Sequence, residues 1–151
     1  MSIDYFKAAE TTLTNLPLLK KSVGILEKRL ERLIQKGAPK EPGSMDFGKP
    51  YVSSHDVNDT LNDLLAIQEV QSEISATKAE IREVQAALKE LPEEQRKVVM
   101  LFYMNGMSAE KIAEKIFVES EKTVYNIRNK GVCNFALLYY GAPARRSRGK
   151  K

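Results

Sequence analysis

The side chains best suited to specific chemistry gather in one short polar stretch near the C-terminus. Residues 120–130 combine Lys and Arg, which can address guanine edges or phosphates, with Asn, which can bond adenine in a bidentate way. Helical spacing places Val124 and Ile127 on one side and the polar side chains on the other. This pattern is typical of a helix that reads DNA in the major groove. The candidate DNA-binding residues are Ser120, Glu121, Lys122, Tyr125, Asn126, Arg128, Asn129 and Lys130.

Position along this helix predicts two roles. In helix-turn-helix proteins the N-terminal part of the recognition helix reaches bases, while later residues contact the DNA backbone. Any one of these side chains fits a solvated charged face equally well, and it is the combination that favours DNA. We expect base contacts from Glu121, Lys122, Tyr125 and Asn126, and phosphate contacts from Arg128, Asn129 and Lys130.

The residues before this stretch mark the ends of the helices that must position it. Pro92 suits the first turn of a helix, where a missing N–H costs nothing. Gly106 can take the left-handed conformation that ends that helix. Ser108 and Ser120 are candidate N-caps of the next two helices. Apolar residues at helical spacing would form the shared core, namely Val98, Val99, Leu101, Phe102, Ile112, Ala113 and Ile116.

The stretch from Leu91 to Val132 resembles region 4 of bacterial sigma factors, and this resemblance implies a helix-turn-helix that binds double-stranded promoter DNA. Two departures stand out: Phe117 occupies a position where sigma-like proteins often have glycine, and the turn at 117–120 is one residue longer. A longer turn would tilt the recognition helix. The matching residues are Leu91, Pro92, Val98, Val99, Leu101, Tyr103, Gly106, Ser108, Ile112, Ala113, Val118, Ser120, Thr123, Val124 and Arg128.

The charge distribution agrees with a polyanionic partner. The 151-residue chain has a net charge of +4, but residues 56–91 carry −5 and residues 92–151 carry +6. The basic end therefore coincides with the helix-turn-helix. Residues 142–151 are predicted to form a basic disordered tail, whose alternative role is simply to solubilise the chain. Auxiliary phosphate contacts are expected from Ser108, Arg145, Arg146 and Arg148.

Enzymatic chemistry finds no support in the sequence. Cys133 is the one cysteine and His55 the one histidine, so neither a disulfide nor a metal-site spacing is present. Asp56, Asp59 and Asp63 have the spacing of an acidic helix start and solvent face. We therefore expect no catalytic residue, metal or cofactor. There is no apolar run of eighteen residues and no signal segment, so we expect a cytoplasmic protein without a membrane partner.

The first 91 residues carry the heptad-like pattern of a helical hairpin. Leu16, Leu19, Val23, Leu26, Leu30 and Leu33 recur at alternating spacings of three and four, as in a coiled coil. A second, longer seam runs from Ile67 to Leu91, and the Pro- and Gly-rich stretch at about 37–55 reverses the chain. We expect a separate short helix at 3–13, then a helix at 16–36 with Pro17 in its first turn, and a third at about 56–90.

These elements predict an all-α fold, an N-terminal antiparallel helical hairpin (coiled coil) followed by a sigma region 4-like helix-turn-helix domain. The expected domains are 1–91, 92–141 and the tail 142–151. The long second seam needs a further cover. A second copy, making a homodimer, is one candidate; the helix at 3–13 or the apolar stretch at 132–139 is the other, and the sequence does not decide between them.

The order of hairpin, loop, long acidic helix and C-terminal helix-turn-helix resembles the phage and prophage late transcriptional regulators of the ArpU/RinA-like group. That resemblance implies a regulator that acts at a promoter with host RNA polymerase. One alternative is a DNA-packaging recognition subunit of the small terminase type, which an oligomer of eight or more subunits would favour. Another is a polymerase- or sigma-binding protein that does not read DNA.

Overall fold

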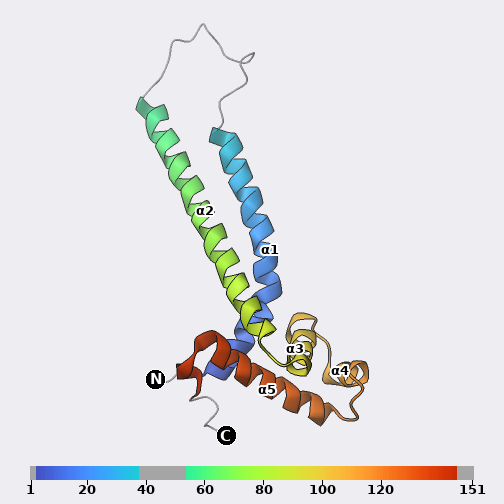
Figure 1. The fold of residues 1–151 in the computed structure, drawn as a ribbon. Helices are drawn as coiled ribbons and strands as arrows, with labels where there is room; N and C mark the ends of the chain where they lie inside the picture. The colour runs from blue at the N-terminus through green and yellow to red at the C-terminus, as the bar shows by residue number, and fades with distance from the viewer. Residues whose placement is uncertain (1–2, 38–53, 146–151) are drawn as a thin grey trace. The chain divides into compact units, whose positions relative to one another are not determined.

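A computed structural model describes residues 3–37 and 54–145. Every regular element in these ranges is a helix, which confirms the all-α class (Figure 1). The elements form two compact units, one from the chain up to Lys20 together with Ala79 onward, the other from Lys21 to Lys78. No described helix is long and apolar enough to cross a membrane. The helices are α1 (Tyr5–Gly37), α2 (Ser54–Lys89), α3 (Glu93–Val99), the π-helix η2 (Met100–Met104), α4 (Ala109–Lys115), α5 (Glu121–Tyr140) and the 3-10 helix η3 (Ala142–Ala144).

The second unit is an antiparallel pair made from parts of α1 and α2, as the sequence predicts. Lys36 Nζ lies 3.6 Å from Asp63 Oδ1, and Lys78 Nζ lies 3.3 Å from Glu27 Oε2. The later residue of α1 pairs with the earlier residue of α2, so the helices run in opposite directions. Solvated ion pairs of this kind contribute little stability. Burial comes from the predicted seam, whose most buried members in this unit are Val70 and Ile74.

The N-terminal segment differs from the prediction, because one continuous helix replaces the expected break near residue 15. Pro17 lies inside α1 rather than in the first turn of a new helix. A proline within a helix costs about 3 kcal/mol. Leu13 and Leu16 just before it are 0% and 1% exposed, and burying each contributes about 1.5–3 kcal/mol. Packing therefore outweighs the local preference of proline, and the predicted break is wrong.

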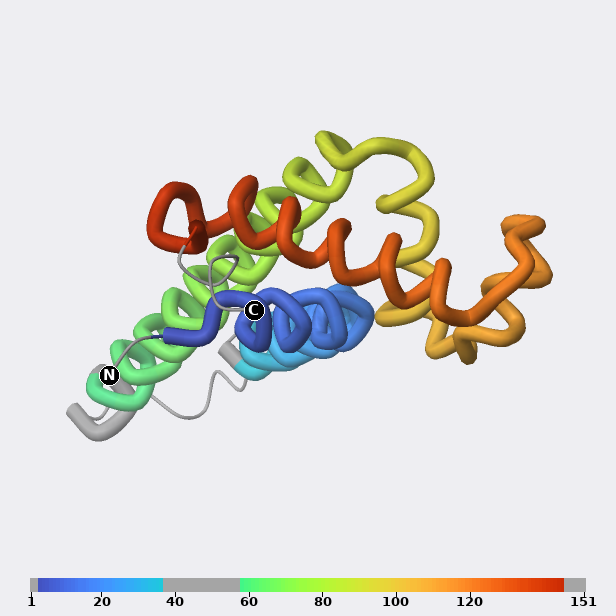
Figure 2. Tube along the Cα trace, turned by 90° about the horizontal axis from the view of Figure 1, so that it is seen from below, coloured from blue at the N-terminus to red at the C-terminus, as the bar shows by residue number. Residues whose placement is uncertain are grey.

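The core of the first unit surrounds the second half of α5. Phe135 and Val132 are completely buried there against Leu13 of α1 and Val84 of α2. Figures 1 and 2 show the first turns of α1 beside this half of α5. The hydroxyls of Thr12 and Tyr140 lie 2.9 Å apart and add a polar link. This part of the α2 seam is thus covered within one chain, by both of the intramolecular elements that the sequence offers.

The start of the predicted tail is also corrected. Ala142–Ala144 form η3, and Ala144 is 1% exposed within the core of the first unit. Gly141, at φ 81°, ends α5 and turns the chain back towards that core. The prediction that the disordered tail begins at residue 142 is wrong, because a single alanine is too weakly hydrophobic for its burial to be predicted from the sequence. The remainder of the tail, including Arg146 and Arg148, lies outside the described residues.

Candidate nucleic-acid interface

The helix that precedes the helix-turn-helix is built from α3 and η2 in succession. Glu93 and Glu94 lie in its first turn, where carboxylates favour the positive end of a helix. The helix then widens into the π-helix η2, and Gly106, two residues after its end, has φ 67° and stops the helical run. Met107 N–H donates to the Leu101 carbonyl at 3.0 Å and closes the turn. The predicted glycine stop is therefore confirmed, while the π-helical turn had no sequence signal.

Both predicted serine caps are present. Ser108 Oγ accepts the Lys111 N–H at 3.3 Å at the start of α4, and Ser120 Oγ accepts the Thr123 N–H at 3.2 Å at the start of α5. Each cap satisfies an N–H group that the helix itself leaves without a partner. The cap uses Ser108 Oγ as an acceptor, whereas a phosphate contact would use its O–H as a donor, so the auxiliary contact that the sequence suggested stays a prediction.

The turn between α4 and α5 is a Schellman motif with an unusual residue at its left-handed position. Val118 N–H donates to the Ala113 carbonyl at 3.0 Å, and Phe117 N–H points to the Glu114 carbonyl at 3.4 Å. Phe117 has φ 61°, the conformation that glycine adopts without strain. Its side chain is 93% exposed. The residue that replaces the usual glycine therefore keeps the glycine backbone geometry.

A small core of its own holds α4 across the N-terminal half of α5. Ile112 and Val124 are completely buried at its centre, and Val98 packs on them from α3. Ile127 is partly buried at the edge, as its predicted inward position requires. The remaining members are Leu101, Ala109 and Ala113, with Phe102, Met107, Ile116 and Val118 packed around them.

This core leaves the polar face of α5 open to solvent. Lys122, Asn126, Asn129 and Lys130 are exposed, at spacings of three, four and seven that put them on one side of a helix. Tyr125 is 40% exposed on the same face. The structure thus brings the predicted base-contacting and phosphate-contacting residues together as one continuous surface. Glu121 and Ser120 lie exposed at its N-terminal end.

Arg128 is less free than its neighbours on this surface. Its guanidinium lies 4.7 Å from the ring centre of Phe102 and 5.0 Å from that of Tyr125. Its Nη2 and Nε donate to Asn129 Oδ1 at 2.7 and 3.1 Å. Cation–π contacts of this kind hold a guanidinium in one orientation. Arg128 therefore links α5 to η2 through Phe102, which the sequence predicted as a core residue but not as a partner of Arg128.

A close helix contact anchors the other half of α5. Gly131 is buried, and a Cβ built on it would lie 2.7 Å from Val99 Cγ2 and 3.3 Å from Gln95 Cβ. Three residues further on, Asn134 Nδ2 donates to Gln95 Oε1 at 2.9 Å. Only glycine lets α3 and α5 approach this closely, so Gly131 helps to fix how α5 lies on α3.

Tyr103 ties η2 to α1. Its hydroxyl donates to Glu10 Oε2 at 2.6 Å. Burial, followed by this hydrogen bond, raises the pKa of Tyr103 well above its usual value of about 10. The tyrosine therefore stays neutral and keeps its donor throughout the physiological range. This link starts far outside the helix-turn-helix in sequence, so helical spacing gave no signal for it.

Arg145 is the one predicted tail contact within the described residues. It is exposed, and its Nε donates to the Ala142 carbonyl at 3.4 Å. The described residues contain no group of three His, Cys, Asp or Glu side chains arranged to hold a metal ion. What the surface offers is hydrogen-bond donors, amides and cations on a rigid helix, which is chemistry for recognition.

Comparison with known proteins agrees with this geometry over part of the chain. The family model described as Sigma-70, region 4 matches residues 81–126, from the end of α2 into the first turns of α5. This segment is a sigma region 4-like helix-turn-helix, a class of domain that binds DNA and RNA polymerase. The match covers the base-contacting candidates and stops before Arg128, Asn129 and Lys130. No curated protein and no solved structure matches the chain.

Proposed function

We propose that this protein is a sequence-specific transcriptional regulator of phage origin that binds promoter DNA and acts with host RNA polymerase. The observation that carries the proposal is the exposed polar face on the N-terminal half of α5, whose C-terminal half is fixed in a core. Lys122 and Asn126 provide the donors and the amide that suit base edges. Lys130 and the basic C-terminal segment supply cations for phosphates.

The proposal is tested by selecting bound duplexes from a random DNA pool. We expect the wild-type protein to enrich one motif, and Lys122→Ala/Asn126→Ala to lose it. Lys28→Ala/Asn62→Ala removes the same two residue types from exposed positions in the second unit and is the matched control, which should enrich the wild-type motif. Equal enrichment by all three proteins, or none, would refute base reading by α5.

The symmetry of the motif also reports the assembly. A homodimer predicts a two-fold operator with half-sites separated by whole turns of about 10 base pairs. A single asymmetric site predicts one reading helix per complex.

Acidic residues at the start of the recognition helix favour a second candidate function. Glu119 and Glu121 are both exposed beside the Ser120 cap, where a phosphate would otherwise be attracted to the helix end. A protein that binds polymerase or sigma without reading DNA would tolerate these charges. Under that alternative, the wild-type protein enriches no motif but binds purified RNA polymerase, and Lys122→Ala/Asn126→Ala binds it equally well.

A further inference from the structure

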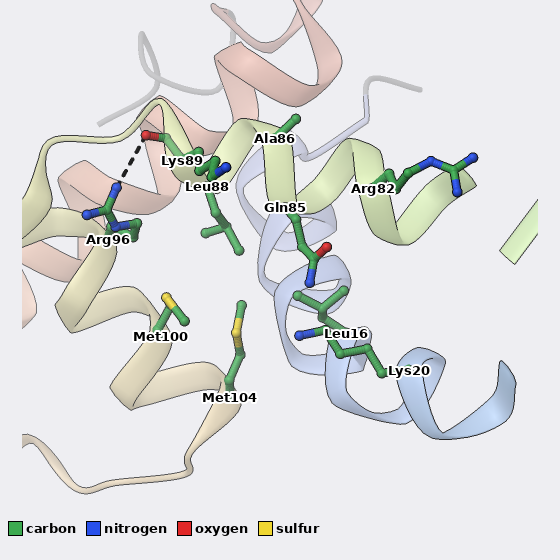
Figure 3. A pocket seen from close by; sticks show the side chains of 10 residues that line it. All are labelled: Leu16, Lys20, Arg82, Gln85, Ala86, Leu88, Lys89, Arg96, Met100 and Met104. Carbon is green, nitrogen blue, oxygen red and sulfur yellow. Dashed lines mark hydrogen bonds between the residues drawn. The ribbon is translucent and has the colours of Figure 1, made fainter. Parts of the chain in front are cut away.

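An open groove of about 800 Å³ lies in the first unit, where α1, the end of α2 and the α3–η2 segment meet. Its floor is apolar. Figure 3 shows Met100 and Met104 on the η2 side, Leu16 on the α1 side and Leu88 between them. Met100 is 41% exposed, which is high for an apolar side chain at the meeting point of three helices. Leu16 and Leu88 are only 1% and 4% exposed, so Met100 and Met104 supply the apolar surface that a partner could cover.

Four cations surround this floor, and no acidic side chain of the described residues lines it. Lys20 comes from α1, Arg82 and Lys89 come from α2, and Arg96 comes from α3. The first three are exposed. Arg96 is half-buried, with its Nη1 donating to the Lys89 carbonyl at 3.3 Å (Figure 3). Cations gathered around a cleft focus a positive potential, which selects an anionic partner.

The spread of these cations indicates the shape of that partner. Arg82 and Lys89 are seven residues apart on α2, about 10 Å along the helix axis. Lys20 and Arg96 stand on the other two walls. One small anion cannot reach all four positions, whereas an extended ligand with acidic flanks can. Because the groove is open, such a ligand can lie along it, as an amphipathic helix lies in a hydrophobic groove.

The groove lining also discriminates among anionic macromolecules. Proteins that bind single-stranded nucleic acid rely on aromatic rings for base stacking. No aromatic residue of the described chain lines this groove. Met100 and Met104 instead supply flexible, polarisable side chains, which adapt to aliphatic partners.

We propose that this groove docks an acidic amphipathic helix of a partner protein. Its apolar side packs on Met100 and Met104, and its carboxylates meet the surrounding cations. None of the candidate DNA-binding residues lines the groove. The docking site is thus separate from the reading face of α5, and it stands whether or not that face reads DNA.

A designed peptide pair tests the proposal on the full-length protein. The probe is a fluorescent helix of about 18 residues with leucines at the i, i+3, i+4 and i+7 positions and glutamates along both flanks. Its partner peptide carries lysines in place of the glutamates. We expect the acidic peptide to bind at least about tenfold more tightly by fluorescence anisotropy, with affinity falling as salt rises.

Charge reversal locates the site. Arg82→Glu/Lys89→Glu should weaken binding of the acidic peptide by about tenfold or more. Lys28→Glu/Arg29→Glu makes the same charge change at exposed positions in the second unit and should leave the affinity unchanged. Circular dichroism checks that both variants fold. Equal affinity for the two peptides, or equal loss in the two variants, overturns the proposal.

Methyl NMR of labelled methionines then identifies the occupant. The acidic peptide should shift Met100 and Met104 but not Met107, which packs in the helix-turn-helix core. Three results would contradict the proposal: displacement of the peptide by oleate, the same shifts on raising protein concentration alone, or the same shifts with duplex DNA. Displacement by oleate would identify a small amphiphile as the occupant of the groove. Shifts that depend on protein concentration would identify a second copy of the chain, and shifts with duplex DNA would identify nucleic acid. Duplex selection with Arg82→Glu/Lys89→Glu should still enrich the wild-type motif, so the two proposals fail separately.

Discussion

Replacing Gly131 with alanine tests whether α3 and α5 are as close in solution as they are in the structure. The new Cβ would lie 2.7 Å from Val99 Cγ2, with Gln95 Cβ and the Gln95 carbonyl at 3.3 and 3.4 Å behind it. Val99 is completely buried, so its methyl group has no free space to enter. Overpacking of this kind costs about 1–3 kcal/mol. The better helix propensity of alanine returns about 0.5–1 kcal/mol, so the net loss is about 1 kcal/mol.

Gly24 provides the matched control within the same chain. It lies inside α1, and a Cβ built on it meets nothing within 4 Å. Gly24→Ala should therefore raise the free energy of unfolding by about 0.5–1 kcal/mol, measured by urea denaturation with circular dichroism. Gly131→Ala should lower it, and the loss should disappear in a Val99→Ala background, where the clashing methyl group is absent. If Gly131→Ala stabilises the protein as much as Gly24→Ala does, the inferred close contact is wrong.

Three further predictions follow from single side chains. Phe117→Gly should raise the free energy of unfolding by about 1 kcal/mol in the same urea assay, because it relieves the left-handed strain of an exposed residue; Phe117→Ala, which keeps the strain, should not. Tyr103→Phe should lower the free energy of unfolding by about 1 kcal/mol near neutral pH, because it removes the hydrogen bond to Glu10. The folded state holds the Tyr103 proton more tightly than the unfolded chain does, so this stabilisation is complete below a pH of about 10 and declines as the pH rises above it. The free energy of unfolding should therefore change less between pH 9 and pH 11 in Tyr103→Phe than in the wild type. Lys130→Ala should leave the selected DNA motif unchanged and reduce the slope of log affinity against log salt by about 0.9, and a changed motif would mean that Lys130 reads bases.

Features set by neighbouring residues were predictable from the sequence. Ser108 and Ser120 are caps because a serine side chain can reach an N–H group three residues on. Gly106 ends its helix because a left-handed residue is cheapest as glycine. The buried positions of Val98, Ile112 and Val124 follow from helical spacing alone. In each case the physical cause lies within a few residues of the effect.

Features set by distant contacts were not predictable in this way. Pro17 is a strong local sign of a helix start, but its neighbours gain more from packing on α5 than the proline costs. Phe117 tolerates a left-handed backbone because two hydrogen bonds of the turn depend on it. The hydrogen bond between Tyr103 and Glu10 joins residues 93 positions apart. The periodicity of a helix or a strand reports only which residues share a face, so it does not predict contacts between residues this far apart in the sequence.

The second half of α5 is held by the N-terminal segment of this chain, outside the helix-turn-helix core. The first half of α5 has only the small helix-turn-helix core beneath it, while the second half buries Val132 and Phe135 against α1 and the end of α2. The matched sigma segment stops at residue 126, before these residues. The first half of α5 packs on the helix-turn-helix core through Val124 and Ile127, and the second half adds a separate buried contact. The cover that holds the second half comes from Ala9, Leu13 and Leu16, at the opposite end of the sequence.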